Sequence, residues 1–312
     1  MSDPLIIAFD PSYISKLGNY TDGTGRYWSE VARQTKWEME ASGIATVDLK
    51  NKATLYLDMV QKVGRHEGET LLDYYASTII TRKKKRQVIS KYLVADAYSP
   101  KQPFVDEFVN HGFHVVSRFR KDSNLRYLYH GMHPTGPGRT KKYDGKVNFQ
   151  NLRDENFTAG AIDEAGKWIA YYGRVNSPAL NRDIGLVVVH DLKKDGSIKK
   201  HPIYLSTDLT LDGGQVLRMY QCRFQQEFLC QDAKQKLGLE HCQAYCWQKN
   251  DFHFNVSLTV ASLAKVAYNL KQLGEPTAPF SIADVKTKHI NEYQARRILP
   301  LCSVDLDPNL IE

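Results

Sequence analysis

Two short apolar runs in the first half of the chain each end in an aspartate. Residues 5–9, LIIAF, are followed by Asp10, and residues 92–95, YLVA, are followed by Asp96. Runs of this length that are apolar at every position are typical of strands buried on both faces of a sheet. Pro11 cannot donate to a strand ladder, so we expect the first strand to end at Asp10. A turn or cap role is the structural alternative for each aspartate.

Between these two runs the pattern first alternates and then becomes helical. Residues 44–49 and 54–60 alternate on either side of a polar turn, which predicts an antiparallel hairpin. Residues 67–85 carry apolar side chains at helical spacing. The helix would end in the basic run RKKKR at residues 82–86, where the helix dipole favours cations. A phosphate contact is the alternative for that run.

Residues 12–43 are polar and basic, with tyrosine and tryptophan among the cations. Cations interleaved with aromatic side chains suit a nucleic-acid strand. A surface loop folded over its own aromatic residues is an equal alternative.

The order of these elements predicts the fold class. Residues 104–110 read as a helix and residues 114–119 as a third buried strand. Strand, hairpin, helix, strand, helix and strand in this order describe an α/β, ribonuclease H-like fold, a mixed five-stranded sheet with flanking helices. Its first and fourth strands lie side by side and parallel. Asp10 and Asp96 would then project from neighbouring strand ends.

Residues 126–208 interrupt this order with a mostly β segment. Residues 131–145 contain several glycines and prolines and read as a loop, which carries the cations Arg139, Lys141 and Lys142. Strands are expected at 167–175, 184–192 and 199–206. The basic loop is a candidate DNA contact, and a structural insertion is the alternative.

A helix without glycine or proline is predicted for residues 220–234. At about 100° per residue, four side chains fall within an arc of roughly 60°. They are Tyr220, Arg223, Glu227 and Lys234. Leu217, Phe224 and Phe228 form an apolar stripe beside that arc, which we expect to hold the helix on the core. A surface cluster of ion pairs is the structural explanation for one Glu between two cations.

The same four residues carry a resemblance to a known family. Tyr-x2-Arg-x3-Glu-x6-Lys resembles the motif of DDE transposases of bacterial insertion sequences, in the group often called family four. Three further stretches look similar to that family, and together they extend the resemblance over nearly the whole chain. They are IIAFDPSYISK, YLVADAYSPKQPFVDEF, and DAKQKLGLEHCQA with DFHFNVSLTVASLAK.

The resemblance implies a catalytic role for three carboxylates. Asp10, Asp96 and Glu227 would be the DDE triad and would bind two Mg²⁺ ions, with Mn²⁺ as a substitute. Magnesium takes few protein carboxylates and keeps sites for water and phosphate oxygens, and two such ions suit cleavage and transfer of DNA strands. Tyr220, Arg223 and Lys234 would bind phosphates of the transposon end.

The resemblance also implies partners and a division of the chain. Double-stranded DNA, as transposon ends and target, would be bound by a homodimer in a synaptic complex in the bacterial cytoplasm at the nucleoid. The core would occupy residues 1–125 and 209–275, the mostly β insertion residues 126–208, and a C-terminal helical tail residues 276–312. Residues 256–270 are the most apolar of the later helices and read as core, and residues 283–297 as a terminal helix.

Composition is compatible with this assignment. The chain has 312 residues, 42% of them apolar, a formal net charge of +7 and a pI near 9.0, which suits a polyanionic partner. Five cysteines without a CxxC pair argue against a disulfide framework. No apolar run approaches membrane-spanning length, and residues 1–10 lack the features of a signal peptide.

The chain departs from the family pattern at its beginning. Family members normally start with a helical domain that recognises the transposon ends, whereas Asp10 lies almost at the first residue here. Two functions follow: a DNA-cutting and strand-transferring core, or a truncated partner that pairs with full-length transposase and inhibits it.

Overall fold

The structure is a computed structural model, and it describes residues 5–16, 20–29, 32–64, 67–132, 139–162, 167–271 and 280–302. Its strands are β1 (Leu5–Ser15), β2 (Thr24–Ser29), β3 (Gln34–Asp48), β4 (Ala53–Gln61), β5 (Tyr92–Val94), β6 (His114–Phe119), β7 (Arg126–Leu128), β8 (Tyr143–Lys146), β9 (Phe157–Ile162), β10 (Trp168–Ser177), β11 (Arg182–Leu192), β12 (Ile198–Lys200) and β13 (Ile203–Ser206). Its helices are α1 (Leu71–Ile80), α2 (Lys83–Ile89), α3 (Gln102–Asn110), α4 (Gly213–Cys222), α5 (Phe224–Lys236), α6 (Trp247–Lys271) and α7 (Ile282–Ile298).

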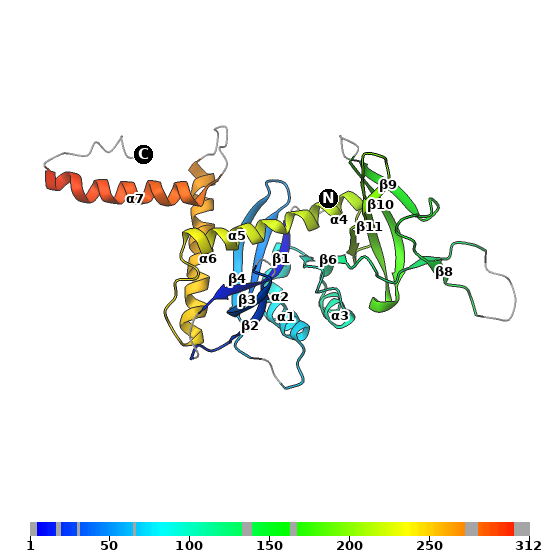
Figure 1. The fold of residues 1–312 in the computed structure, drawn as a ribbon, viewed down its shortest axis with the longest axis horizontal. Helices are drawn as coiled ribbons and strands as arrows, with labels where there is room; N and C mark the ends of the chain where they lie inside the picture. The colour runs from blue at the N-terminus through cyan, green and yellow to red at the C-terminus, as the bar shows by residue number, and fades with distance from the viewer. Residues whose placement is uncertain are drawn as a thin grey trace.

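All thirteen of these strands belong to one mixed sheet. Five of them follow the order β4-β3-β1-β5-β6, in which β1, β5 and β6 are parallel and β3 and β4 form an antiparallel hairpin. The sheet does not end at β6, because β13 pairs with that strand antiparallel and is followed by β11 and β10. Residues 126–208 therefore extend the sheet. Figure 1 shows them at one end of an elongated molecule, with α6 and α7 at the other.

Strand β1 is longer than the sequence predicts. It pairs with β3 from Leu5 to Ser15, so the expectation that it ends at Asp10 is wrong. Pro11 is tolerated because β5 pairs with β1 only at Ile7 and Ala8, which leaves that side of β1 open beyond Ala8. The expected loop over residues 12–43 is also mostly strand, since β2 and the first half of β3 form a ribbon that continues the sheet.

The predicted helix at residues 67–85 divides into two. Thr70 begins α1 with a capping box, in which its side chain accepts from the Asp73 N–H and Asp73 caps Thr70 in return. The basic run then lies at the start of α2 and not at the end of α1, so the dipole argument does not apply to it.

Helices cover both faces of the sheet around β1. On one face α1 and α3 pack on Ile7 and Phe9. On the other face α4 packs on Ile6 and Ala8, and α5 and α6 pack on Ile14. The alternation of side chains along β1 therefore places Asp10 on the face covered by α4 and α5.

Two expectations about helix faces are wrong. Phe224 and Phe228 of α5 are exposed, and the side chains that α5 buries are Gln226, Leu229, Cys230 and Ala233. Most apolar side chains of α6 after Phe254 are exposed as well, because only one side of this long helix meets the body. The predicted terminal helix is confirmed as α7. Within the described residues no helix is long and apolar enough to cross a membrane.

Candidate active site

Strand register brings Asp10 and Asp96 to one level of the sheet. Ala8 pairs with Val94 across β1 and β5, so Asp10 on β1 and Asp96, two residues beyond the end of β5, lie at the same level. Their negative charges interact in the folded protein, since Asp96 contributes to the raised pKa of Asp10. The sequence prediction of neighbouring strand-end aspartates therefore agrees with the register, although Asp10 lies within β1 and not at its end.

Arg223 joins Asp10 to the helical glutamate. Its Nη1 donates to Asp10 Oδ1 at 2.8 Å, and its Nη2 donates to Glu227 Oε1 at 2.7 Å. One guanidinium thus contacts both carboxylates by charge-assisted hydrogen bonds. Two of the three predicted catalytic carboxylates are held on either side of a single cation.

The bend between α4 and α5 positions this guanidinium. Arg223 keeps helical dihedrals, φ −53° and ψ −36°, but the hydrogen bonds around it run at three-residue spacing. Its N–H donates to Tyr220 O at 3.2 Å, and its own carbonyl accepts from Gln226 N at 2.9 Å. The helix predicted as continuous over residues 220–234 is therefore two helices that meet at Arg223.

Aromatic rings enclose the guanidinium. Its carbon lies 5.7 Å from the ring centre of Tyr220 and 5.1 Å from that of Phe224. The Arg223 side chain is only 6% exposed, and its buried Nε has no hydrogen-bond partner among the residues that the structure describes. This shielding from water strengthens the attraction between Arg223 and the two carboxylates.

The pKa of Asp10 records the electrostatics of the site. The pKa is raised from an ordinary 3.8 to about 7: burial raises it most, Arg223 lowers it, and the negative charges of Glu227 and Asp96 add to the increase. An ionised Asp10 is therefore costly unless a cation compensates it.

Asp96 has both a turn role and a position near the other acids. Its Oδ1 accepts from the Tyr98 N–H at 3.1 Å and from Ser99 Oγ at 3.0 Å. Ser117 Oγ donates to the Asp96 carbonyl at 2.7 Å and fixes the loop to β6. The turn role, which is the structural alternative for this residue, is thus confirmed, and the second carboxylate oxygen accepts no hydrogen bond within the described residues.

The other predicted DNA contacts differ in accessibility. Tyr220 is buried, with its ring 4.9 Å from that of Tyr204. Lys234 is partly buried, donates to the Tyr13 carbonyl and lies 3.6 Å from Glu240.

The cations of the insertion lie on the surface. Arg139, Lys141 and Lys142 are exposed, and Lys141 pairs with Asp144. Their side chains are accessible to a partner from solvent. They belong to the insertion and not to the elements that carry the three carboxylates.

The carboxylate oxygens of the site suit a hard divalent cation, but in this structure Asp10 and Glu227 both accept hydrogen bonds from Arg223. Within the described residues no three His, Cys, Asp or Glu side chains converge as metal ligands. Carboxylate oxygens are nonetheless the ligands that magnesium prefers. The guanidinium between Asp10 and Glu227 is itself a cation at the position where these acids require one.

Arg118 is a residue that sequence reasoning missed. Val94 pairs with Val116, which places Arg118 of β6 level with Asp96, on the face that carries Val116 and Val94. Its side chain is exposed, and its charge acts on the nearby Tyr220 and Tyr204. The signal was present in the sequence as the arginine within the third strand, HVVSRF.

Acidic side chains from neighbouring strands, together with a helical Glu, are typical of metal-dependent enzymes that act on phosphodiesters. The comparison with known families is consistent with this class. The Transposase DDE domain model matches residues 20–263, a range that includes Asp96 and Glu227 and begins after Asp10. The chain belongs to this family, and DNA is accordingly its substrate. No curated protein matches it.

Proposed function

We propose that this chain is the catalytic core of a family-four DDE transposase, which cleaves DNA strands at insertion-sequence ends and transfers them to target DNA. The observation that carries the proposal is the convergence of Asp10 and Glu227 on one guanidinium, with Asp96 level with Asp10. We further propose that the five strands β4-β3-β1-β5-β6 form a ribonuclease H-like core, which their order and directions support.

Asp10, Asp96 and Glu227 would hold two Mg²⁺ ions, or Mn²⁺ in their place. Such ions, when bound, supply Lewis-acid activation of a water or a 3′ hydroxyl and stabilise the leaving oxygen of an in-line displacement. The chain itself would provide the negative charge that binds them, from β1, the loop after β5 and α5. The raised pKa of Asp10 means that its carboxyl holds a proton over part of the neutral pH range.

Arg223 and Lys234 are proposed to add positive charge beside these acids and so attract DNA phosphates. Arg223 offsets part of the negative charge of Asp10 and Glu227, which keeps the two acids together in the absence of another cation. Arg139, Lys141 and Lys142 would contact the duplex backbone at a distance from the chemistry, and Tyr220 would orient Arg223 through its ring.

We propose a homodimer as the active assembly, because joining two transposon ends requires two catalytic cores. Exposed apolar side chains on α6 and α7, including Leu263, Leu270 and Tyr293, support an association of this kind.

A strand-transfer assay tests the proposed function. A duplex carrying a terminal repeat with a free 3′ hydroxyl is incubated with supercoiled plasmid and the protein. Joined products are expected with Mg²⁺ or Mn²⁺, few with Ca²⁺, and none in excess chelator. Joining that persists in chelator would rule out the metal-dependent proposal.

A further inference from the structure

A second surface borders the carboxylates, on the side of the sheet that α1 and α3 cover. Tyr13 follows four residues after Phe9 on β1, and the regular pairing of β1 with β3 keeps both side chains on that side. Asp10 lies on the opposite side, where Arg223 contacts it. The carboxylates thus lie between the α5 side of the sheet, which carries Arg223, and the α1 side, which carries Tyr13.

Two tyrosines of the α1 side lie close to the acids. Burial most strongly raises the pKa of Tyr13 to about 12, and the negative charges of Asp10 and Asp96 are among the groups that add to the increase. Tyr98 follows Asp96 by two residues and donates its backbone N–H to that carboxylate at 3.1 Å. Tyr13 is 37% exposed and Tyr98 is 49% exposed, so both rings are accessible to a partner.

Lys101 adds an anchored positive charge to this surface. Its Nζ lies 4.6 Å from the ring centre of Tyr98, an arrangement in which the ring attracts the ammonium group. Its backbone is held at both ends, because its N–H donates to Ser99 O at 2.7 Å and its carbonyl accepts from Val105 N at 3.0 Å. Lys101 is exposed, so its charge is held beside Asp96 and is still accessible.

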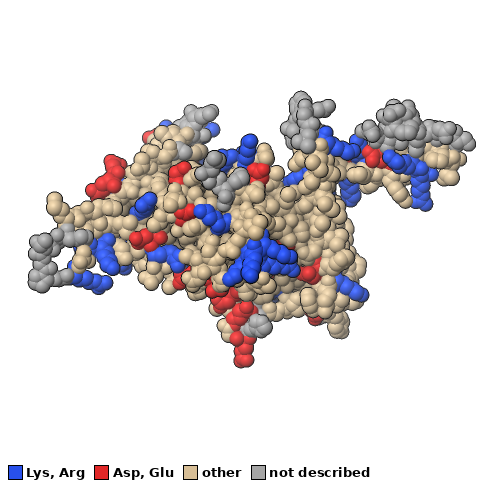
Figure 2. Space-filling view, turned by 180° about the vertical axis from the view of Figure 1, so that it is seen from behind, with Lys and Arg blue, Asp and Glu red and all other residues tan. Residues whose placement is uncertain are grey.

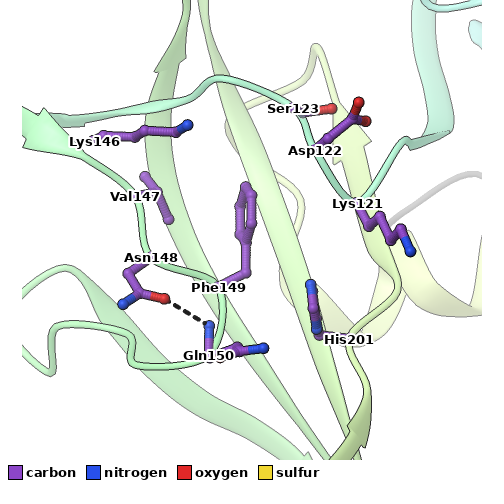
Figure 3. Close-up of a pocket in the computed structure, with 9 residues that line it drawn as sticks. All are labelled: Lys121, Asp122, Ser123, Lys146, Val147, Asn148, Phe149, Gln150 and His201. Carbon is purple, nitrogen blue, oxygen red and sulfur yellow. Dashed lines mark hydrogen bonds between the residues drawn. The ribbon is translucent and has the colours of Figure 1, made fainter.

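Lys121 continues this surface along the same edge of the sheet. Strand β6 is parallel to β5, and Phe119 at its end packs in one cluster with Val105 of α3. Lys121 is exposed two residues later, and Figure 3 shows its side chain directed away from Phe149. Lys101 and Lys121 therefore follow neighbouring parallel strands, at the edge that carries the carboxylates.

Strand transfer brings two DNA segments to the carboxylates at the same time. The attacking 3′ hydroxyl belongs to the transposon end, and the phosphate that it attacks belongs to the target. In the proposed function Arg223 and Lys234 attract the transposon end, and both belong to the segment of α4 and α5. The target must therefore reach the carboxylates from another side, and the α1 side offers exposed aromatic rings and cations.

We propose that Tyr98 and Lys101, with Lys121 further along the edge, bind the sugar–phosphate backbone of the target DNA. The proposal rests on the proposed function, because only strand transfer requires a target. The ammonium groups contact phosphates, and the rings of Tyr13 and Tyr98 pack against the sugars. Such contacts fix the position of a duplex and carry no direct sequence information, so this surface accepts duplexes of unrelated sequence.

The dependence of strand transfer on target concentration tests the proposal. The donor duplex with its 3′ hydroxyl is held at saturation, and the concentration of supercoiled plasmid is varied. In Lys101→Ala the plasmid concentration at half-maximal rate should rise about fivefold, while the rate at saturating plasmid changes less than about twofold. Lys101→Arg, which keeps the charge, should remain close to the parent, as should Tyr98→Phe, which keeps the ring.

Lys91→Ala is the matched control. Lys91 precedes β5, at the opposite end of that strand, and its Nζ lies 5.2 Å from the ring centre of Tyr92. This substitution removes the same charge from a similar lysine–tyrosine pair, and it should leave the plasmid dependence unchanged. Thermal melting establishes that each variant is folded.

Titration of the donor duplex at saturating plasmid separates the two DNA segments. The half-saturating concentration of the donor should be the same in Lys101→Ala and in the parent. An increase for the donor instead of the plasmid would place the transposon end on this surface and overturn the proposal. An unchanged plasmid dependence in Lys101→Ala would overturn it as well.

Duplex binding in Ca²⁺ gives a readout that requires no strand joining. In anisotropy titrations, the slope of log affinity against log salt should fall by about 0.9 in Lys101→Ala and stay unchanged in Lys91→Ala. A slope equal to that of the parent would show that Lys101 contacts no phosphate. Failure of the parent to join strands would refute the proposed function, whereas normal joining with parental plasmid dependence in Lys101→Ala would refute only the target surface.

Discussion

Arg223 is the residue through which the helical Glu and the strand Asp are connected. It donates to Asp10 and to Glu227 from a position that water hardly reaches. The motif spacing identifies the residue types, but it does not indicate that one arginine would donate to both acids. That orientation depends on the bend at residue 223, which no periodicity in the sequence predicts.

Loss of this arginine should destabilise the protein. Arg223→Ala leaves Asp10 uncompensated in a buried site, at a cost of about 3 kcal/mol. The melting temperature should therefore fall, and Mn²⁺ should raise it more in the variant than in the parent, because the ion replaces the lost charge. Arg296→Ala, on the exposed side of α7, is the control that should change neither quantity. A variant as stable as the parent would show that Arg223 does not hold the acids.

The raised pKa of Asp10 gives a pH dependence with a defined sign. Since the folded-state pKa of about 7 exceeds the ordinary 3.8, this carboxyl stabilises the fold at low pH, and that contribution is lost as pH rises through 7. Asp10→Asn should remove this decrease in stability with rising pH, because asparagine does not ionise. Without divalent metal, the melting temperature of the variant relative to the parent should rise between pH 5 and pH 8 by about 2 °C or more. A difference that is constant with pH would contradict the raised pKa of Asp10.

At the scale of elements, the sequence predicts strands and helices that follow from a local pattern of apolar residues. It does not predict features that depend on packing against other elements. The buried strands at residues 92–95 and 114–119, the hairpin and the terminal helix are present, because continuous apolar runs and alternation have few other solutions. The local pattern does not predict which face of α5 is buried. Its Phe residues are exposed, and the side chains that it turns toward Gly43 of β3 are Gln226 and Cys230.

Gly43 is the glycine that permits this close approach. Its carbonyl accepts from Gln226 Nε2 at 2.6 Å, and a Cβ at this position would lie 2.9 Å from the same nitrogen and 3.2 Å from the Asp10 carbonyl. Gly43→Ala should therefore displace α5 and cost about 1–3 kcal/mol of unfolding free energy, measured by urea denaturation. Gly64→Ala, where nothing lies within 4 Å, is the matched control and should be nearly neutral. Equal effects of the two substitutions would mean that α5 does not depend on the approach.

At the scale of the molecule, positive charge is distributed over several surfaces. Figure 2 shows groups of Lys and Arg on the face turned away in Figure 1, separated by neutral surface and by scattered Asp and Glu. This distribution fits backbone contacts along a duplex, which fix register and carry no direct sequence information. The net charge of +7 predicts binding but not its location. The location of the DNA-binding surface depends on the fold. The sequence pattern alone predicts that surface only near the carboxylates.

Duplex binding should be strongly salt-dependent. Replacing Arg139 and Lys142 together by alanine should reduce the slope of log affinity against log salt by about 2, since each phosphate contact contributes roughly 0.9. Lys141→Ala should have a smaller effect because Lys141 is already paired with Asp144. Anisotropy titrations at several salt concentrations measure both slopes. An unchanged slope in the double variant would exclude these residues from the interface.

The role of the three carboxylates is tested most directly by cleavage of supercoiled plasmid in Mg²⁺. Asp10→Asn, Asp96→Asn and Glu227→Gln should each reduce nicking by at least about a hundredfold, because each removes a charge that holds the ions. Glu155→Gln, at an exposed acid 3.8 Å from Arg153, should nick as fast as the parent. Circular dichroism should show that all four variants remain folded. Nicking by any one triad variant at the parental rate would contradict the assignment of that carboxylate.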